Sequence, residues 1–284
     1  MKTGLVLEGG ACRGVFTSGV LDTMLDRGLT FDYCIGVSAG AGNAMNFRSG
    51  QRGRAFALTA GTESPVYFGF RQALESKKLL NLDLIYNRLS FEPPMPFDFG
   101  AYYANPMACE YVVTDCGTGG ALYLSERAYQ KRLVAIVEAS SSMPGICAPV
   151  TVDGRPCLDG GIADPMPVAR AMEQGCDRVV LVTTKPADNL HPTDFRKVRH
   201  VLYGLYGQRY PALCEALMTR YDRYFAQMDE ILALEKAGRL FVIRPTHCEI
   251  RGLEKDHEKM RGYYRHGLEI AGAVWDDLTA YLGG

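Results

Sequence analysis

One serine in this sequence has the surroundings of a catalytic nucleophile. Ser38 lies between Gly36 and Gly40 in the stretch IGVSAG, which has the spacing G-x-S-x-G. An apolar run precedes it and a helix-forming run follows it, so we expect a sharp turn from a strand into a helix. The unpaired N–H groups and the dipole of that helix terminus favour a developing anion. The alternative is an ordinary serine that caps a helix in a glycine-rich turn.

A second glycine-rich turn, EGGACRG at residues 8–14, separates the first predicted strand from the first predicted helix. Such a turn directs several backbone N–H groups at one point and forms an anion site. We interpret it as an oxyanion hole, in which the N–H groups near Gly10 and Ala11 face the tetrahedral intermediate formed at Ser38.

The same turn has a competing interpretation as a dinucleotide site. Gly9, Ala11 and Gly14 form a degraded G-x-G-x-x-G, which requires an acidic residue at the end of the second strand to hold the ribose. The acid nearest to that spacing, Asp32, stands at the start of the second predicted strand. The sequence therefore favours the oxyanion hole over an NAD(P) site, and a tight turn that binds nothing is the remaining alternative.

A serine nucleophile needs a base, and the sequence offers two kinds. Asp159 is followed by Gly160 and Gly161 in LDGG. An isolated Asp-Gly usually forms a turn, but two glycines also let another segment approach the carboxylate closely. In α/β-hydrolases the base is a histidine later in the chain, and both His191 and His247 satisfy that order. We expect both histidines to lie at the surface or in loops.

Alternating strands and helices are predicted to position these residues. The predicted strands and hairpins cover residues 3–8, 31–37, 110–125, 150–161, 177–184 and 239–245. The predicted helices cover residues 15–28, 39–47, 131–140, 167–175, most of 193–236, and 246–284. This alternation implies a mostly parallel sheet that is covered on both faces.

GGACRG, GVSAG and DGG, in this order, resemble the motifs of the patatin-like phospholipase family. That family combines an N-terminal G-G-G-x-[KR]-G turn with G-x-S-x-G and a later D-G-[GA]. The similarity extends from residue 4 to about residue 185 and includes the segment SSSMPGICAPV. The resemblance implies an α/β fold, a three-layer α/β/α sandwich with a mostly parallel central sheet.

The resemblance also implies a role for each motif residue. Ser38 is then the nucleophile and Asp159 the base of a Ser-Asp dyad that uses no histidine. The oxyanion hole is formed by Gly9, Gly10 and Ala11. The residues that support these motifs are Arg13 at the family's basic position, Gly14, Gly36, Gly40, Gly160 and Gly161.

The chain departs from the family pattern at Ala11, which stands where the family has its third glycine. If that position needs a positive φ, the Cβ costs on the order of 1 kcal/mol, although the N–H group is retained. A free aspartate has a pKa of about 3.9 and is a weak base for a serine hydroxyl. Burial of Asp159 would raise its basicity. We therefore expect acyl transfer from an ester to Ser38, followed by hydrolysis by water that Asp159 activates.

Composition limits the other function classes. The chain has 284 residues, 47% of them hydrophobic, and a net charge of −1, so we expect no nucleic-acid partner. The start MKTGLVLEGG lacks the apolar run of a signal peptide, and no stretch is long and apolar enough for a transmembrane helix. The nine cysteines form no C-x-x-C pair, which favours reduced thiols in a cytoplasmic protein. We expect no cofactor and no metal, because Asp83, Asp98 and Asp115 are not spaced as ligands.

We predict a single domain over residues 1–284, with a motif-bearing core at about 4–185 and a helical C-terminal part, containing one late strand, at 186–284. Residues 63–107 resemble a lid or an insertion. Tyrosines and arginines alternate in residues 201–225, which are either a membrane-facing surface or a packed helix pair, the latter being favoured.

The predicted function is that of a serine acyl hydrolase acting on lipid acyl esters, of phospholipase A or lysophospholipase type. The expected partner is a lipid or acyl-ester substrate, with peripheral contact at the inner face of a membrane as a further expectation. A non-catalytic lipid- or ligand-binding protein on the same scaffold is the alternative from a different class, and Ala11 is its motivation.

Overall fold

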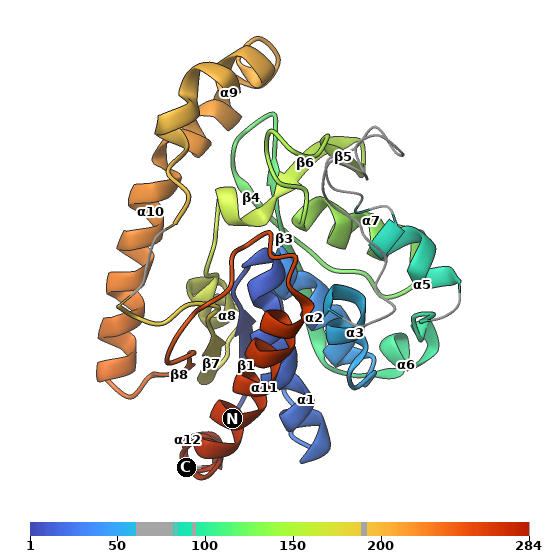
Figure 1. Ribbon diagram of the computed structural model, residues 1–284, viewed down its shortest axis with the longest axis vertical. Helices are drawn as coiled ribbons and strands as arrows, with labels where there is room; N and C mark the ends of the chain where they lie inside the picture. Colours follow the sequence, from blue (N-terminus) through green and yellow to red (C-terminus); the bar gives the residue numbers. More distant parts are fainter. Residues whose placement is uncertain (61–81, 83, 93–94, 189–191, 284) are drawn as a thin grey trace.

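The computed structural model describes residues 1–60, 82, 84–92, 95–188 and 192–283 (Figure 1). Eight strands of this part form one sheet in the order β5-β6-β3-β2-β1-β7-β8, with β4 also paired to β3. The strands are β1 (Thr3–Leu7), β2 (Tyr33–Val37), β3 (Ala108–Asp115), β4 (Ala121–Leu124), β5 (Val150–Val152), β6 (Arg155–Asp159), β7 (Arg178–Val182) and β8 (Leu240–Ile243). The strands β3-β2-β1-β7-β8 are parallel, while β4, β5 and β6 are joined by antiparallel pairings.

Helices cover both faces of this sheet. They are α1 (Gly14–Asp26), α2 (Ala39–Arg48), α3 (Arg54–Ala60), α5 (Leu89–Phe91), α6 (Phe99–Ala104), α7 (Gln130–Ser140), α8 (Val168–Glu173), α9 (Arg199–Tyr206), α10 (Pro211–Lys236), α11 (His257–Ala273) and α12 (Trp275–Gly283). Short 3-10 or π turns are η1 (Ala11–Arg13), η2 (Leu84–Arg88), η3 (Gly160–Ile162) and η4 (Phe195–Val198).

The apolar side chains on both faces of the sheet explain why helices cover both faces. Alternate side chains of a strand point to opposite faces, and in β1 both faces are apolar. Leu5 and Leu7 pack with residues of α1, α2, α7 and α11, whereas Val6 packs with residues of α8 and α10. Figure 1 shows α10 on one side of the sheet and α1, α2 and α11 on the other. The predicted three-layer α/β/α sandwich is therefore confirmed.

One predicted helix is wrong in part. Residues 246–284 were expected to be helical throughout, but α11 begins only at His257. The Asp256 side chain caps it by accepting hydrogen bonds from the N–H groups of Glu258 and Lys259. The preceding loop carries Gly252, whose carbonyl accepts a hydrogen bond from the N–H of Cys12 at 2.9 Å. This loop satisfies its polar backbone by binding the glycine-rich turn rather than by forming helix.

The structure also bears on the predicted lid and on residues 201–225. Residues 63–81, 83 and 93–94 of the predicted lid lie outside the described residues, and its described remainder includes η2, α5 and α6. Residues 201–225 fall in α9 and α10, which pack against each other through Leu202, Tyr206 and Leu213. The packed helix pair is thus present. Val201 and Leu205 of α9 are nonetheless 62% and 58% exposed.

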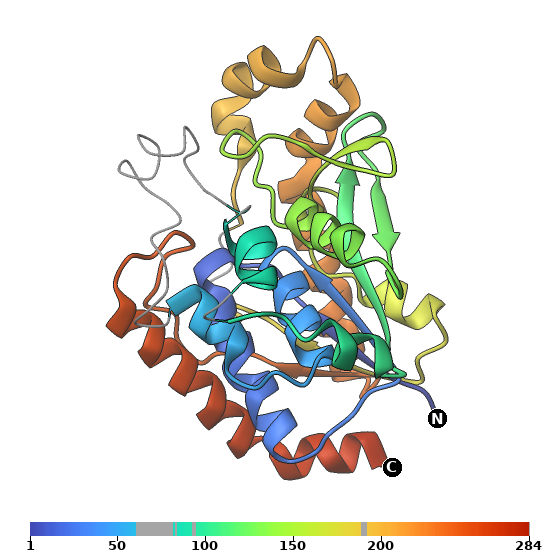
Figure 2. The same cartoon turned by 90° about the vertical axis from the view of Figure 1, so that its right-hand side faces the viewer.

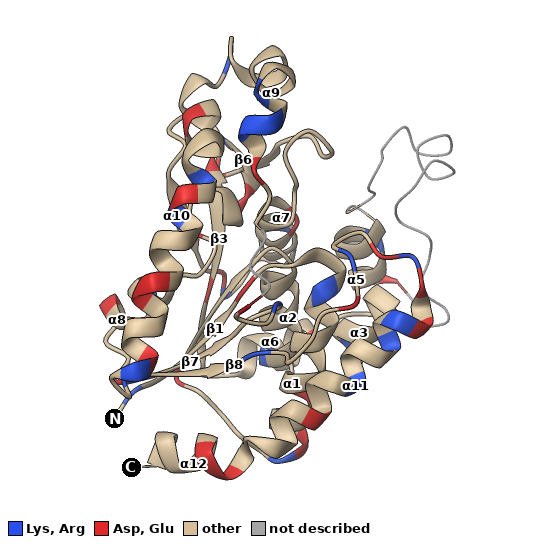
Figure 3. Ribbon diagram, turned by 60° about the vertical axis from the view of Figure 1, so that its left-hand side comes forward, with Lys and Arg blue, Asp and Glu red and all other residues tan. Residues whose placement is uncertain are grey.

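Charges of both signs are mixed along the outer helices α10 and α11, as Figure 3 shows. None of the described helices is long and apolar enough to cross a bilayer. In the same part of the chain, no three His, Cys, Asp or Glu side chains are grouped as metal ligands. Figure 2, turned by 90°, shows α11 alongside α1. The C-terminus lies near the side of the sheet where the parallel strands begin.

Candidate active site

Ser38 stands at the sharp turn that joins β2 to α2. Its backbone has φ 55° and ψ −122°, an unusual conformation for a residue with a Cβ. The flanking glycines permit this turn, because a Cβ on Gly40 would overlap the carbonyl of Leu7 and a Cβ on Gly36 would overlap that of Gly40. The hydroxyl of Ser38 does not cap its own helix. The interpretation of Ser38 as an ordinary capping serine is therefore not supported.

The hydroxyl of Ser38 instead donates a hydrogen bond to Asp159. The distance from Ser38 Oγ to Asp159 Oδ2 is 2.7 Å, between residues 121 positions apart in the sequence. The other carboxylate oxygen, Oδ1, accepts a hydrogen bond from the N–H of Gly161 at 2.8 Å. Both Ser38 and Asp159 are only 9% exposed. Burial raises the pKa of Asp159, and the hydrogen bonds from Ser38 and Gly161 partly oppose that shift.

The register of β3 explains why these two residues meet. On one edge of β3, Val112 is paired with Val37 of β2, and the next residue, Val113, is paired with Asp159 of β6. The other edge is occupied by β4 over the same residues, so β2 and β6 must follow each other along a single edge. The end of β2, which leads into Ser38, therefore lies against the end of β6. A Cβ on Gly160 would overlap the carbonyl of Val112, so this close junction requires glycine.

The glycine-rich turn lies beside Ser38. A Cβ on Gly9 would approach the Cβ of Ser38 to 2.9 Å. Within the described residues, the N–H groups of Gly9, Gly10 and Ala11 have no hydrogen-bond acceptor, whereas that of Cys12 is bound to Gly252. Ala11 has φ 48°, so the conditional expectation of a positive φ at this position is met. Three adjacent free donors next to a serine hydroxyl can stabilise an oxyanion.

Three consecutive serines hold the neighbouring segments in place. Ser140 Oγ accepts a hydrogen bond from the N–H of Ser38 at 2.9 Å. The hydroxyl of Ser141 is hydrogen-bonded to that of Tyr86 at 2.9 Å. The carbonyl of Ser142 accepts a hydrogen bond from the N–H of Asp159 at 2.9 Å. The sequence segment SSSMPGICAPV thus contacts both Ser38 and Asp159, a role that its motif resemblance did not specify.

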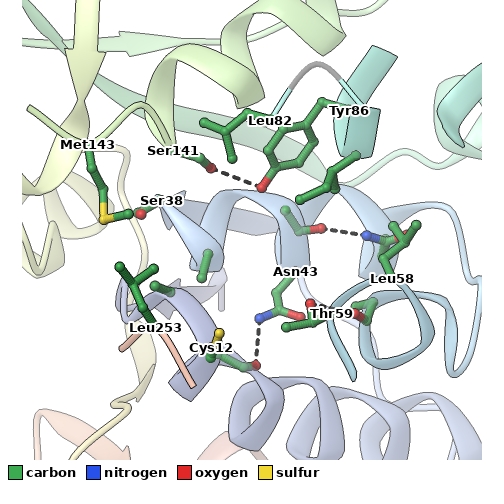
Figure 4. A pocket seen from close by; sticks show the side chains of 17 residues that line it. Cys12, Ser38, Asn43, Leu58, Thr59, Leu82, Tyr86, Ser141, Met143 and Leu253 are labelled. Carbon is green, nitrogen blue, oxygen red and sulfur yellow. Dashed lines mark hydrogen bonds between the residues drawn. The ribbon is translucent and has the colours of Figure 1, made fainter. Parts of the chain in front are cut away.

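Two cavities meet at Ser38. The first, of about 100 Å³, is shown in Figure 4 and is lined mainly by apolar side chains such as Leu58, Leu82 and Tyr86. The second, of about 460 Å³, lies on the side of Asp159. The residues common to both are Ala11, Ser38, Met143 and Leu253. An ester bound at Ser38 can therefore extend in two directions.

The larger cavity contains charged residues that the motifs did not identify. Arg220 of α10 donates through Nε to the carbonyl of Gly161 at 2.6 Å, and its charge lowers the pKa of Asp159. Glu8 is buried, and Lys185 follows β7. Glu8 lies in the glycine-rich stretch and could have been suspected from it. Arg220 and Lys185 could not, because nothing in their local sequence marks them.

No histidine of the described part of the chain lines either cavity at this site. His191 lies outside the described residues. His247 is exposed, and its ring packs against that of His266 with centroids 4.2 Å apart. Neither His247 nor His266 lines either cavity. Among the described residues, the carboxylate that accepts a hydrogen bond from the Ser38 hydroxyl is that of Asp159.

The dinucleotide interpretation conflicts with the position of Asp32. Its carboxylate accepts hydrogen bonds from the N–H and the hydroxyl of Thr3 at 2.8 and 3.0 Å, at the start of β1 and β2. The glycine-rich turn follows the opposite end of β1. In parallel strands these ends lie on opposite edges of the sheet, so Asp32 cannot hold a ribose at that turn.

Comparisons with known proteins give matches to two family models and to a solved structure. The family model described as Patatin-like phospholipase matches residues 5–172. A second model, a domain of unknown function (DUF6363), matches residues 210–283. A solved structure of VipD from Legionella pneumophila has a TM-score of 0.54 at 15% identity, covering 97% of this chain and 67% of that one. The structural likeness shows a common fold.

The curated relatives that the chain matches are longer than the chain itself. The uncharacterized protein YjjU of Escherichia coli (strain K12) is 29% identical over 205 residues, covering 71% of this chain and 57% of that protein. Lysophospholipase NTE1 of Yarrowia lipolytica is 27% identical over 68% of this chain, and that of Saccharomyces cerevisiae 24% identical over 99%. This chain spans only 13% and 17% of those two lysophospholipases.

Proposed function

Because the chain belongs to the patatin-like phospholipase family, we propose that it is a serine acyl hydrolase that cleaves carboxylic esters of lipids. The observation that carries this proposal is the 2.7 Å hydrogen bond from Ser38 Oγ to the buried carboxylate of Asp159. Relatives named lysophospholipases support a lipid ester as the substrate. The apolar cavity beside Ser38 supports an acyl chain on one side of the ester.

In the proposed mechanism Ser38 and Asp159 act as a pair. Ser38 Oγ attacks the ester carbonyl carbon while its proton passes to Asp159. The negative charge on the carbonyl oxygen is stabilised by N–H groups of Gly9, Gly10 and Ala11. The intermediate then expels the alkoxide oxygen, which takes the proton from Asp159 and departs as the alcohol, and the acyl group stays on Ser38. Asp159 next removes a proton from water as the water oxygen attacks the acyl carbon. When the bond from that carbon to Ser38 Oγ breaks, Asp159 returns the proton to Ser38 Oγ and the carboxylic acid leaves.

A fluorophosphonate probe tests this proposal directly. Intact mass should rise by a single adduct located at Ser38, because only an activated serine reacts readily with such a probe. Ser38→Ala should remove the label and lower ester hydrolysis at least about 10³-fold. Ser125→Ala, at an exposed serine, is the matched control and should be labelled like the wild type.

The same assay separates the dyad from its alternatives. Asp159→Asn should lose activity, whereas His191→Ala and His247→Ala should retain it. A strong loss in either histidine variant would rule out the dyad. A folded wild-type protein that takes no label would instead support the non-catalytic binding protein.

A further inference from the structure

The larger cavity has a cationic wall built from three separate segments. Arg13 comes from η1, Lys185 from the segment after β7, and Arg220 from α10. The acidic residues that line the same cavity are Glu8 and Asp159. When all five groups are ionised, the three cations exceed the two carboxylates by one positive charge.

The two carboxylates are already engaged by other donors. Glu8 Oε2 accepts hydrogen bonds from the N–H and hydroxyl of Thr184 at 2.6 and 3.0 Å, and Oε1 accepts one from the hydroxyl of Tyr224 at 3.0 Å. Asp159 is held by Ser38 and Gly161. Both carboxylates therefore already accept hydrogen bonds from donors of the fold or of the candidate dyad.

The two arginines of this wall have N–H groups that can still donate hydrogen bonds to a ligand. In the described part of the chain, neither Arg13 nor Arg220 has a carboxylate oxygen within 4.0 Å. Arg13 Nε is buried and has no hydrogen-bond partner there. Arg220 uses Nε and Nη1 on the carbonyls of Gly161 and Thr193, which leaves Nη2. Guanidinium groups with unused donors bind oxyanions such as phosphate.

Lys185 adds charge to this wall rather than balancing it. Burial lowers the pKa of Lys185, and the positive charges of Arg13 and Arg220 lower it further, while Glu8 acts in the opposite direction. An anion bound among the three groups would relieve this repulsion. A quaternary ammonium group would instead add to the repulsion, because it carries a fixed positive charge. Such groups bind to aromatic cages or carboxylates.

We propose that Arg13, Lys185 and Arg220 bind the phosphate group of a monoacyl lipid whose ester lies at Ser38. This inference rests on the proposed ester hydrolysis and specifies its substrate class. The acyl chain occupies the apolar cavity of Figure 4, and the phosphate occupies the larger cavity on the other side of Ser38. The preferred substrate is then a monoacylglycerol phosphate, not its choline ester.

The test compares three esters that share one acyl chain: monoacylglycerol phosphate, its choline phosphodiester and neutral monoacylglycerol. The 284-residue chain should show at least about 10-fold higher kcat/KM for the phosphate monoester than for the choline ester. Lys185→Gln should lower kcat/KM for the phosphate monoester about 10- to 100-fold more than for the neutral ester. Lys185→Arg should recover most of that loss. Lys236→Gln, at an exposed lysine of α10, is the matched control and should leave the preference unchanged.

Equal kcat/KM for the three esters, or an equal loss on all of them in Lys185→Gln, would overturn the inference. Inorganic phosphate distinguishes a free-phosphate site from a lipid site. Tight competition by inorganic phosphate without any headgroup preference would overturn the lipid assignment. If no ester is hydrolysed, the proposed function fails. The Ser38→Ala protein should in that case still bind monoacylglycerol phosphate more tightly than the choline ester in calorimetry, and equal binding would overturn the inference separately.

Discussion

In the proposed mechanism Asp159 acts as a base at a position where burial opposes its charge. Burial raises its pKa, and the hydrogen bonds from Ser38 and Gly161 and the charge of Arg220 lower it, with burial dominant. A raised pKa makes the ionised carboxylate a stronger base. It also costs stability at neutral pH, because the folded protein holds a proton on Asp159 more tightly than the unfolded chain does.

The raised pKa of Asp159 leads to a prediction about the pH dependence of activity and stability. Hydrolysis should fall in acid, with a midpoint above the ordinary aspartate value of 3.8, because Asp159 must be ionised to accept a proton. Asp159→Asn should be inactive yet more stable than the wild type above the raised pKa. That gain should shrink as the pH falls from the raised value toward 3.8, where the wild-type carboxyl becomes neutral. Thermal unfolding across this range measures the effect.

The exposed Asp229→Asn serves as the control for loss of one carboxylate and should show no such pH-dependent gain. An Asp159→Asn protein that is less stable than the wild type at neutral pH would contradict the assignment of burial as the dominant effect.

Ala11 carries backbone strain, and this leads to a second prediction. Its φ of 48° costs a residue with a Cβ about 1–2 kcal/mol, while glycine costs about 0.4–1 kcal/mol through the unfolded chain. Ala11→Gly should therefore raise stability by roughly 0.5–1 kcal/mol, or about 2 °C in Tm, and should retain activity because the N–H group remains. Ala226→Gly, in the exposed middle of α10, should instead lose up to about 1 kcal/mol. A fall in Tm for Ala11→Gly would show that the alanine Cβ contributes more by packing than it costs by strain.

At the scale of elements, most strands and helices near the motifs could be predicted from the sequence. Near the motifs the prediction worked because β1 and β2 are apolar and largely buried and lead into the glycine-rich turns around Gly9 and Gly40. Gly28, whose φ is 68°, likewise marks the end of α1. What the sequence could not show is that β2 and β6 share one edge of β3. Asp159 was for that reason an ambiguous candidate until the strand order was known, since an Asp-Gly pair usually marks only a turn.

Helices α1 and α11 give the prediction at this scale. They pack so closely that a Cβ on Gly267 would overlap the carbonyl of Phe16, and a Cβ on Gly19 would overlap that of Tyr264. Gly267→Ala should therefore destabilise the protein by about 1–3 kcal/mol through overpacking. Gly262→Ala lies on the same helix in open space and should stabilise it by up to about 1 kcal/mol. Denaturant unfolding measures both, and similar effects of the two changes would contradict the close packing.

At the scale of the whole molecule, the two family models do not correspond to separate layers. The first ends at residue 172, yet β8 extends the same sheet at residues 240–243 and α11 covers its face. Tyr224, Met228 and Ile231 of α10 complete the core on the opposite face. The candidate site also takes Arg220 from this later part. The prediction of one domain over residues 1–284 is therefore testable by truncation.

A chain of residues 1–198 should be insoluble or lack cooperative unfolding, because it exposes both apolar faces that α10 and α11 cover. Supplying residues 199–284 as a separate chain should restore solubility and fluorophosphonate labelling. Circular dichroism and thermal unfolding of the truncated chain decide the matter. A truncated chain that unfolds cooperatively would show that the first part is an independent domain.

The limits of prediction at this scale have a physical reason. Glycine motifs are visible in sequence because they serve local backbone geometry at the turns around Ser38 and Asp159. Arg220, Lys185 and the loop that carries Leu253 reach the site only through tertiary packing. No local sequence pattern marks these side chains, so the sequence alone could not identify them as part of the site.

Arg220 connects the proton affinity of Asp159 with the proposed binding of phosphate. It lowers the proton affinity of Asp159 and also lines the wall proposed to bind phosphate. A bound phosphate cancels that positive charge, so the ligand and the catalytic proton are thermodynamically coupled through one side chain. The coupling is reciprocal: phosphate strengthens the base, and protonation of Asp159 tightens the hold on phosphate by the same factor. The pH midpoint of hydrolysis should consequently be higher with a phosphate-bearing ester than with a neutral one, so the substrate itself would tune the base that cleaves it.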